Sequence, residues 1–378
     1  MTSPTPLPTL DDARTALAAA ESLVERAVAR AREITANGER IDDHQVLADR
    51  VAYAATEARA ARELVAYTDE MKRAGRADAQ LEMLAVASVA DLALAIRNRI
   101  EPALGDLGLD EAAIDAAFPA SVRELLRRAA NESVFRAIGR HVAETRGRNT
   151  MPLDEISEQV RDAVREFAEK EIAPHAERIH RHDELVPEAF ISKMSELGYF
   201  AMSVPEEFGG QEFGNLAMIL TTEELSRASL AAAGSLITRP EILTKALIQG
   251  GTAEQKKHWL PKIAAGELMV GISVTEPDVG SDVASLKCRA DRATVGARDG
   301  WVINGPKSWC TFAGRANVLA LLARTDPDLA KGAKGLSLFI VPKESFDGHS
   351  FESKQPEGGR MVGKADATPG YRGMHSYI

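Results

Sequence analysis

The spacing of hydrophobic residues changes once along the chain, close to Gly266. Before this point apolar residues recur at helical spacing. After it they form short runs bounded by Gly, Pro or Asp, which are typical of β-strands. The chain has 378 residues, and single hydrophobic cores stop growing near ~250–300 residues. The sequence therefore predicts an α+β protein of several domains, with helices first and strands last.

Residues 1–150 are rich in Ala, Glu and Arg and contain no Trp or Cys. Thr9 followed by Asp12 resembles a capping box, which marks the start of a helix. Four long amphipathic helices are predicted, over residues 9–38, 43–75, 78–102 and 121–144. Long helices joined by short loops predict an up-and-down bundle in this first domain.

Residues 151–267 are predicted to form a second helical domain, entered through a linker at 146–152. Its helices are expected over residues 153–172, 187–197, 215–229, 231–249 and 252–265. Residues 268–378 are predicted to form a small antiparallel β-domain, with strands at 269–275, 300–304, 318–323 and 336–341. No helix-length pattern separates these strands, so parallel crossovers are not expected.

Charge and cysteine usage exclude several classes of protein. The formal net charge of -10 argues against a broad surface for nucleic acid or anionic membranes. The two cysteines, Cys288 and Cys310, cannot build a disulfide framework or a metal cluster, which favours a reducing compartment. No signal peptide is recognised, and no apolar run approaches the ~20 residues that span a bilayer. A cytoplasmic protein without a nucleic-acid or membrane partner is expected.

The segment S-V-T-E-P-D-V-G-S-D, residues 273–282, ends a predicted strand in a turn. Thr275 can offer a hydroxyl and a backbone N–H to a heterocycle, and Gly280 lets the main chain approach a ligand closely. Ser281 can donate a hydrogen bond to an anion or a carbonyl. An ordinary surface turn is the alternative interpretation, because Pro, Gly, Ser and Asp are abundant in turns.

The segment N-G-P-K-S-W-C-T, residues 304–311, is the second candidate. Trp309 can lay a flat face on a ring cofactor, and Thr311 offers a hydroxyl two residues later, on the same side of a strand. Packing of Trp309 in the core is the alternative. Polar pairs elsewhere are less informative: Glu206 and Glu207 are adjacent and point to different faces.

Together the two segments resemble those of the acyl-CoA dehydrogenase family, which carries V-T-E-P-x-x-G-S-D followed by I-N-G-x-K-x-W-[IC]-T at a similar separation. Residues 205–210, 251–267 and 334–342 resemble further family segments in the same order. The resemblance runs from about residue 153 to the end of the chain, which makes a chance match improbable.

The resemblance implies an FAD enzyme that removes hydrogen from Cα and Cβ of an acyl-CoA thioester, with a homodimer or homotetramer as its assembly and an electron-transfer flavoprotein as its electron acceptor. The implied FAD contacts are Ile272, Val274, Thr275, Gly280, Ser281, Trp309, Cys310 and Thr311. In this interpretation Thr275 and Thr311 bond the flavin edge and Trp309 packs on its ring. Ser281 lies between the flavin and the substrate thioester.

The family takes its catalytic base, a Glu, from a C-terminal helical domain. Because the resemblance ends inside the β-domain, that domain is expected to be absent, the chain is expected to be a piece of a longer protein, and no catalytic residue is assigned. Residues 61–67, 100–105 and 131–138 are nevertheless similar to the family's C-terminal bundle. An unrelated Ala-rich bundle is the alternative, and Glu132 receives no role.

Residues 235–243 and 355–377 resemble family members that oxidise methylsuccinyl-CoA to mesaconyl-CoA. Arg239 is the candidate for binding the free carboxylate of such a branched dicarboxylic substrate. Its alternative is a surface arginine before Pro240. Other short acyl-CoA substrates, of the isovaleryl or glutaryl type, and a non-catalytic interaction module remain as alternatives. No metal site is expected, because His175, His180 and His182 lack the spacing of zinc ligands.

Overall fold

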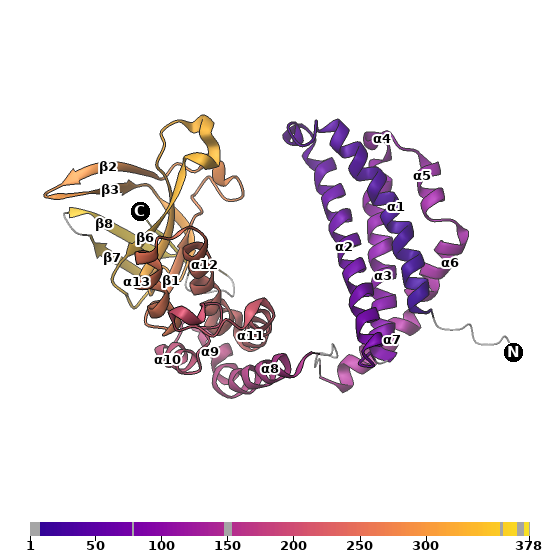
Figure 1. The fold of residues 1–378 in the computed structure, drawn as a ribbon, viewed down its shortest axis with the longest axis horizontal. Coiled ribbons are helices and arrows are strands. Elements are labelled where there is room, and N and C mark those ends of the chain that lie inside the picture. The colour runs from indigo at the N-terminus through magenta and orange to yellow at the C-terminus, as the bar shows by residue number, and fades with distance from the viewer. Residues whose placement is uncertain (1–7, 78, 147–152, 356–357, 369–373, 378) are drawn as a thin grey trace. The chain divides into compact units, whose positions relative to one another are not determined.

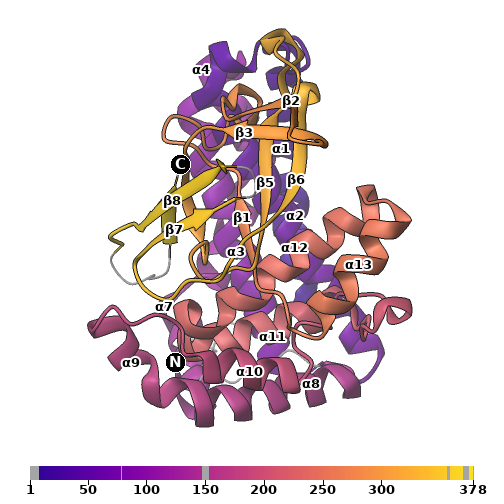
Figure 2. The same ribbon diagram turned by 90° about the vertical axis from the view of Figure 1, so that its left-hand side faces the viewer.

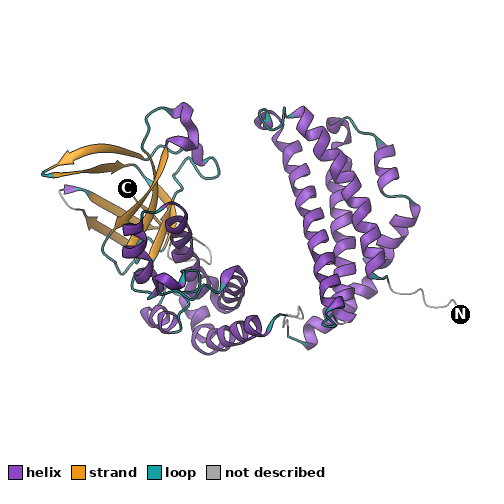
Figure 3. Cartoon of the chain, in the orientation of Figure 1, coloured by secondary structure: helices purple, strands orange, loops and turns teal. Residues whose placement is uncertain are grey.

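The computed structural model describes residues 8–77, 79–146, 153–355, 358–368 and 374–377. The chain divides into two compact units, residues 1–153 and 154–378 (Figure 1). The first unit is helical, and the second combines helices with strands (Figure 3). The predicted boundary between residues 150 and 151 and most of the predicted linker lie outside the described residues, as do parts of the segment 355–377.

The first unit is built on three long helices, α1 (Leu10–Ile34), α2 (Gln45–Arg73) and α3 (Ala79–Ile100). Its shorter helices are α4 (Leu104–Leu107), α5 (Glu111–Ala117), α6 (Ala120–Ala129) and α7 (Glu132–Glu144). The predicted capping box is confirmed, because Thr9 and Asp12 bond each other's backbone N–H. The predicted fourth helix is divided because the Asn131 side chain accepts from Val134 N at 3.0 Å and starts α7 anew.

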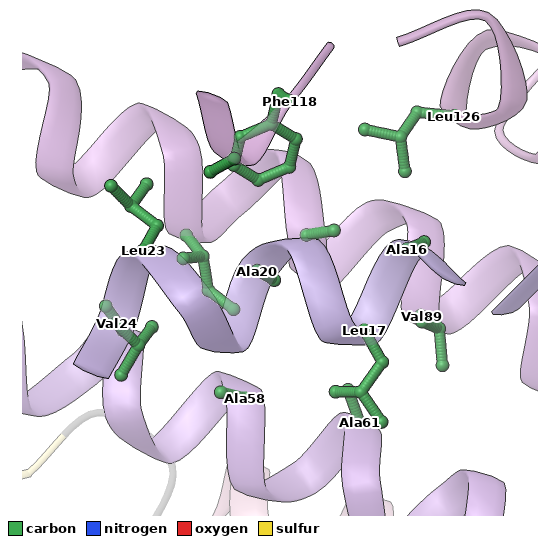
Figure 4. Packing of buried hydrophobic residues seen from close by; sticks show 14 of the residues in the cluster. Ala16, Leu17, Ala20, Leu23, Val24, Ala58, Ala61, Val89, Phe118 and Leu126 are labelled. Carbon is green, nitrogen blue, oxygen red and sulfur yellow. The ribbon is translucent and has the colours of Figure 1, made fainter. Parts of the chain in front are cut away.

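Small side chains let the helices of this bundle approach closely. Ala16 and Ala20 of α1 and Ala58 and Ala61 of α2 are all at most 4% exposed and belong to one core cluster (Figure 4). Larger side chains, among them Phe118, complete the same core cluster. The Ala-rich composition of residues 1–150 thus has a packing reason.

One helical stretch of the described residues, Ala79–Leu107, is long and apolar enough to cross a membrane by length and composition alone. The sequence analysis expected no such stretch. In the structure this stretch begins with α3, which contacts both α1 and α2 and buries Leu81, Ile96 and Ile100 completely. The core position of α3 accounts for its apolar composition.

The second unit begins with helices. These are α8 (Glu155–Phe167), α9 (Ala173–Arg181), α10 (Glu188–Glu196), α11 (Gly214–Ser229), α12 (Ser235–Gly250) and α13 (Ala253–Ala264). A π-helical turn at Ala168–Ile172 joins α8 to α9, and a second one at Leu230–Gly234 joins α11 to α12. Helices α12 and α13 lie against β1 and β5 (Figure 2), where Leu243, Leu260 and Val318 share a buried cluster.

Nine strands follow in the described part of the second unit: β1 (Val270–Ser273), β2 (Arg289–Val295), β3 (Arg298–Asn304), β4 (Lys307–Thr311), β5 (Val318–Arg324), β6 (Leu336–Pro342), β7 (Ser350–Lys354), β8 (Arg360–Ala365) and β9 (Met374–Tyr377). One sheet has the order β1-β5-β2-β3, with β6 also paired to β5, and the other has the order β4-β9-β8-β7. The pairs of the second sheet are antiparallel.

The expectation of a purely antiparallel β-domain is wrong for the first sheet. Strands β1 and β5 are parallel along Val270 to Ser273, and β2 meets β5 in parallel at Arg289 and Arg324. The connection from β1 to β5 contains β2, β3 and β4, so it far exceeds the roughly dozen residues that a parallel crossover needs. Intervening strands, rather than a helix, make the crossover.

Candidate functional site

The two candidate segments meet where β1 ends and β4 begins. The backbone N–H of Ser308 donates to the carbonyl oxygen of Thr275 at 2.9 Å. β1 and β4 are direct neighbours in the fold. Segments that are distant in the sequence are thus brought side by side, as the candidate site requires. We call this place, residues 274–281 together with 307–311, the β1–β4 junction.

A buried ion pair holds the β1–β4 junction together. Lys307 Nζ lies 3.0 Å from Glu276 Oε1 and donates to the carbonyl of Val274 at 2.9 Å. The Lys307 side chain is 0% exposed and the Glu276 side chain 4%. The Glu276 carboxylate also accepts from the backbone N–H groups of Lys287 and Cys288, each at 2.8 Å. The sequence analysis gave neither member of the pair a role, although both lie inside the quoted segments.

Trp309 lies at an irregularity in β4. The pairing of β4 with β9 shifts between Lys307 and Cys310, and the φ angle of Trp309 is 58°. Such a φ is rare for a bulky residue. The indole is 52% exposed, whereas Thr311 is only 8% exposed. The bulge therefore interrupts the simple alternation that would give both side chains the same environment.

Thr275 and Thr311 carry hydroxyls that the protein leaves available. In the part of the chain that the structure describes, neither hydroxyl forms a side-chain hydrogen bond. Hydroxyls of this kind can donate to, or accept from, the edge of a heterocycle. Together with the open face of Trp309, they give the β1–β4 junction the donors and the flat apolar surface that a ring ligand uses.

Gly280 and Ser281 lie at the exposed end of this junction. The turn before them is closed by two backbone hydrogen bonds between Glu276 and Val279, of 2.8 and 3.2 Å. A Cβ built on Gly280 would meet no heavy atom within 4 Å. No described neighbour therefore requires glycine at this position, which leaves room for a ligand beside the main chain. Ser281 is exposed.

The remaining predicted contacts, Ile272, Val274 and Cys310, lie deeper. Cys310 is 1% exposed, and burial raises the pKa of its thiol to about 12. Its side chain faces the core, so Cys310 can reach a ligand only through its backbone. Ile272 packs beside the cluster between the helices and β1, and Val274 gives its carbonyl to Lys307.

Arg239 lies in α12, one residue before Pro240, and is half-buried. Its Nη1 donates to the carbonyl of Ser235 at 2.6 Å and to Thr238 Oγ1 at 2.7 Å. Arg239 is thus neither fully exposed nor without partners, and its hydrogen bonds lie within its own helix.

Lys343 supports the loop that follows β4, and the sequence analysis did not single it out. Its Nζ donates to three backbone carbonyls, those of Gly314 at 2.9 Å, Ala316 at 2.8 Å and Glu344 at 2.7 Å. The rings of Phe346 and Phe351 have their centroids 5.2 and 5.1 Å from the same nitrogen. The lysine is 9% exposed. No sequence signal distinguishes it from a surface lysine.

Lys343 should give the protein a specific dependence of stability on pH. Burial lowers the pKa of Lys343 from 10.5 to about 8. Between these values the unfolded chain binds a proton that the folded chain does not, so the contribution of Lys343 to the free energy of unfolding rises with pH. Denaturant unfolding of the wild type and of Lys343→Met at about pH 7.5 and about pH 10 should show the wild type gaining on the variant. A difference that stays constant over this range would contradict the assignment.

Two cavities lie near the second candidate segment. One, of about 830 Å³, lies between strands of the two sheets and is lined by Cys288, Trp301 and Tyr377, among others, and by Asn304 and Gly305 of that segment. A smaller one of about 30 Å³ touches Phe312 and Arg315. Neither of these two cavities has Thr275, Ser281, Trp309 or Thr311 in its lining.

The other polar groups that the sequence analysis considered are Glu206, Glu207 and three histidines. Glu206 and Glu207 are exposed in a short 3-10 helix, Glu206–Phe208. Among the described residues no group of three or more His, Cys, Asp or Glu is arranged to hold a metal ion. The ring of His175 packs near Phe190, with centroids 5.9 Å apart.

Three sequence profiles of one enzyme family match this chain. The profile "Acyl-CoA dehydrogenase, N-terminal domain" matches residues 154–267, "Acyl-CoA dehydrogenase, middle domain" matches residues 271–375, and "Acyl-CoA dehydrogenase, C-terminal domain" matches residues 9–130. The chain belongs to the acyl-CoA dehydrogenase family. The two segments of the β1–β4 junction fall within the middle-domain match.

Individual relatives agree with the family. (2S)-methylsuccinyl-CoA dehydrogenase of Cereibacter sphaeroides is 34% identical over 96% of this chain and 66% of its own length. Mitochondrial 2-methylacyl-CoA dehydrogenase of Solanum tuberosum is 39% identical over 51% of this chain and 45% of its own. An acyl-CoA dehydrogenase structure from Geobacillus kaustophilus superposes with a TM-score of 0.50 at 28% identity, covering 60% of this chain and 55% of that one. The chain therefore spans about two thirds or less of these acyl-CoA dehydrogenases.

The expected absence of the C-terminal helical domain is wrong. A domain of that type is present, but it lies at the amino-terminal side, over residues 9–130. The similarity of residues 61–67 and 100–105 to that bundle was the available signal. It was weak because Ala, Glu and Arg on helical spacing occur in many unrelated bundles.

The sequence analysis assigned no catalytic base because it expected this domain to be absent. A domain of that type is present, so this reason no longer holds. Glu132 lies just beyond the matched range, at the start of α7. Its side chain is 81% exposed and pairs with Arg136. An exposed, paired carboxylate lacks the desolvated setting that tunes a catalytic base, so Glu132 still receives no role.

FAD is the cofactor of acyl-CoA dehydrogenases, and the residues of the β1–β4 junction fit its ring system. The available hydroxyls of Thr275 and Thr311 suit the polar edge of an isoalloxazine, and the open indole of Trp309 suits its flat face. The free space over Gly280 accommodates a ligand against the main chain. Of the predicted flavin contacts, Thr275, Gly280, Ser281, Trp309 and Thr311 belong to the β1–β4 junction, whereas Ile272 lies outside it and the Cys310 side chain faces the core.

Proposed function

We propose that this protein takes part in the FAD-dependent α,β-dehydrogenation of a short branched dicarboxylic acyl-CoA, with (2S)-methylsuccinyl-CoA oxidised to mesaconyl-CoA. The choice of substrate rests on one observation. The match to the methylsuccinyl-CoA enzyme covers 96% of this chain and so includes the amino-terminal unit, whereas the match to the potato 2-methylacyl-CoA enzyme covers 51%.

In this proposal the chain's own residues bind and orient the reactants. FAD supplies the acceptor for the hydride that leaves Cβ. Thr275 and Thr311 hold the polar edge of the ring, and Trp309 covers part of its face. Ser281 binds the thioester arm of the substrate. A carboxylate must also take the α-proton, and no residue of this chain is assigned that task.

Arg239 is proposed to bind the free carboxylate of the substrate. A guanidinium is permanently charged and can grip a carboxylate with two parallel hydrogen bonds. Among the described residues, its side chain bonds only the carbonyl of Ser235 and the hydroxyl of Thr238, so no carboxylate of the protein occupies it. That leaves its remaining N–H groups available to a substrate.

Replacing Arg239 with methionine should raise KM for methylsuccinyl-CoA about 10-fold to 100-fold, because a charge-assisted hydrogen bond is worth about 1.5–3 kcal/mol. KM for isovaleryl-CoA, which has no free carboxylate, should change little. Steady-state kinetics with both thioesters measures the two effects in one preparation.

Lys245→Met is the matched control, since Lys245 lies on the same helix, is 55% exposed and pairs with Glu241. It should leave both KM values near those of the wild type. If Arg239→Met raises KM equally for the two thioesters, Arg239 does not bind the free carboxylate of the substrate. Preference of the wild type for isovaleryl- or glutaryl-CoA would replace the proposed substrate by the alternative one.

A second function from a different class is a helical interaction module without catalysis. Anaerobic mixing with methylsuccinyl-CoA separates the two, because a dehydrogenase loses its yellow flavin colour as the substrate is oxidised. A folded protein that stays colourless in the presence of FAD would favour the module. The exposed positions of Trp309 and Ser281, which no side chain of the described residues is shown to cover, are the observation that favours this alternative.

The proposal includes partners and a location. An electron-transfer flavoprotein would reoxidise the reduced enzyme, which a coupled dye-reduction assay tests. A homodimer or homotetramer would cover the open junction, and light scattering measures the mass. The two unpaired buried cysteines, Cys288 and Cys310, suit a reducing cytoplasm.

A further inference from the structure

We infer that the Lys307–Glu276 pair is a positioning element of the flavin site, which fixes the distance between Thr275 on one segment and Trp309 with Thr311 on the other. This inference rests on the proposed FAD site. Neither residue touches the face offered to the ring, because their side chains are 0% and 4% exposed. Their action is on the geometry of the residues that do.

The contacts of Lys307 enclose Thr275 from both sides. Its ammonium group bonds the carbonyl of Val274, the residue before Thr275, and the carboxylate of Glu276, the residue after it. A third hydrogen bond, from the backbone N–H of Ser308 to the carbonyl of Thr275, joins the same two segments. Three bonds to three consecutive residues leave the Thr275 backbone little freedom to move relative to β4.

The carboxylate of Glu276 extends the same constraint to a third segment. Its two oxygens accept from the N–H groups of Lys287 and Cys288 at 2.8 Å. The backbone of Glu276 also closes the turn with Val279 that leads to Gly280 and Ser281. The Glu276 side chain therefore connects the start of the T-E-P-D-V-G-S turn to β4 and to the segment at Lys287 and Cys288.

The chemistry of the pair favours positioning over simple stabilisation. A buried ion pair can often be replaced by apolar residues of similar volume without loss of stability, because desolvation offsets the attraction. Hydrogen bonds to named atoms, in contrast, impose a direction and a length. Two other buried cations, Lys343 and Arg324, bond backbone carbonyls. Lys307 pairs instead with a buried carboxylate that lies next to a proposed flavin contact.

The test measures FAD itself on the full chain. In Lys307→Met, the dissociation constant of FAD, measured by quenching of flavin fluorescence, should rise about tenfold or more, because hydrogen bonds from two misplaced hydroxyls are weakened together. At saturating FAD, the midpoint potential of the bound flavin should shift from that of the wild type. A change in folding stability alone would not move the potential of a fully loaded site.

Met361→Ala is the matched control. Met361 is 8% exposed on β8 and shares a buried cluster with Cys310, but it forms none of the hydrogen bonds of the Lys307–Glu276 pair, so its truncation weakens the β-domain core and leaves those bonds in place. It should lower the melting temperature while keeping the dissociation constant and potential of the wild type. Glu276→Gln, which keeps the size of the side chain, serves as the second variant and decides by the same criteria if Lys307→Met does not fold.

The outcomes separate this inference from the proposed function. A wild-type chain that does not bind FAD rejects the proposed function, and the inference with it. A wild type that binds FAD, with unchanged affinity and potential in Lys307→Met, rejects only the positioning role. Equal effects in Met361→Ala would also reject it, because general loss of packing would then explain the result.

Discussion

Replacing Phe118 with alanine should lower the free energy of unfolding of the first unit by about 3–5 kcal/mol. Phe118 is 0% exposed, and among the described residues it has the largest volume of the fully buried side chains. Its ring belongs to the same core as Leu23 and Leu126 (Figure 4). Truncation removes the apolar transfer energy and leaves a cavity that fixed helices can only partly close.

Phe135→Ala is the control for this change, because Phe135 is 44% exposed on α7 of the same unit. It should change stability by less than about 1 kcal/mol. Far-UV circular dichroism follows the helices of both units, whereas fluorescence of the three tryptophans, which all lie in the second unit, follows that unit alone, so a shift seen only by ellipticity reports on the first unit. The ellipticity transition should shift to lower denaturant in Phe118→Ala. Equal shifts for Phe118→Ala and Phe135→Ala would contradict the burial argument.

Gly210→Ala should destabilise the second unit by about 3 kcal/mol or more. A Cβ at Gly210 would lie 1.7 Å from the carbonyl oxygen of Val204 and 2.3 Å from its carbonyl carbon. These are backbone atoms, so no side chain can rotate away to make room. The turn must open, which would break the bond from Gly210 N to the carbonyl of Pro205 at 3.1 Å.

Gly300→Ala provides the comparison, because a Cβ on this strand residue would meet no heavy atom within 4 Å. It should be neutral, or stabilising by up to about 1 kcal/mol, since alanine loses less backbone freedom on folding than glycine does. Tryptophan fluorescence in denaturant reports on the second unit and measures both variants. A Gly210→Ala protein as stable as Gly300→Ala would show that the turn is free to rearrange.

In the helical bundle, the helices and the first capping box could be predicted from the sequence, whereas one helix break and the family of the domain could not. Periodicity located the long helices and the capping box at Thr9 because both depend on contacts between residues that are close in sequence. The break at Asn131 was missed, since helical spacing continues on both sides of it. The family of the bundle was equally hidden, because many sequences satisfy the same Ala-rich packing.

At the proposed flavin site, the candidate contact residues could be predicted from the sequence, whereas the buried residues that support them could not. Its proposed contact residues were predicted from two short segments and the family resemblance they carry, because their residue types and order are specific. The residues that support these segments were not predicted. Lys307, Glu276 and Lys343 look like surface charges in the sequence and are buried in the structure. Charged residues are almost never fully buried unless paired, and pairing across the chain leaves no local pattern.

By itself, the sequence determined the order of helices and strands and the family resemblance from residue 153 onward, and it suggested the residues that are proposed to contact a flavin. Each of these depends on local spacing or on a contiguous motif. Only the tertiary structure decided the parallel pairing of β1 with β5, the bulge that exposes Trp309 and the burial of the Lys307–Glu276 pair. Those features arise from contacts between distant segments, whose energies depend on which atoms meet and not on the residues beside them in the chain.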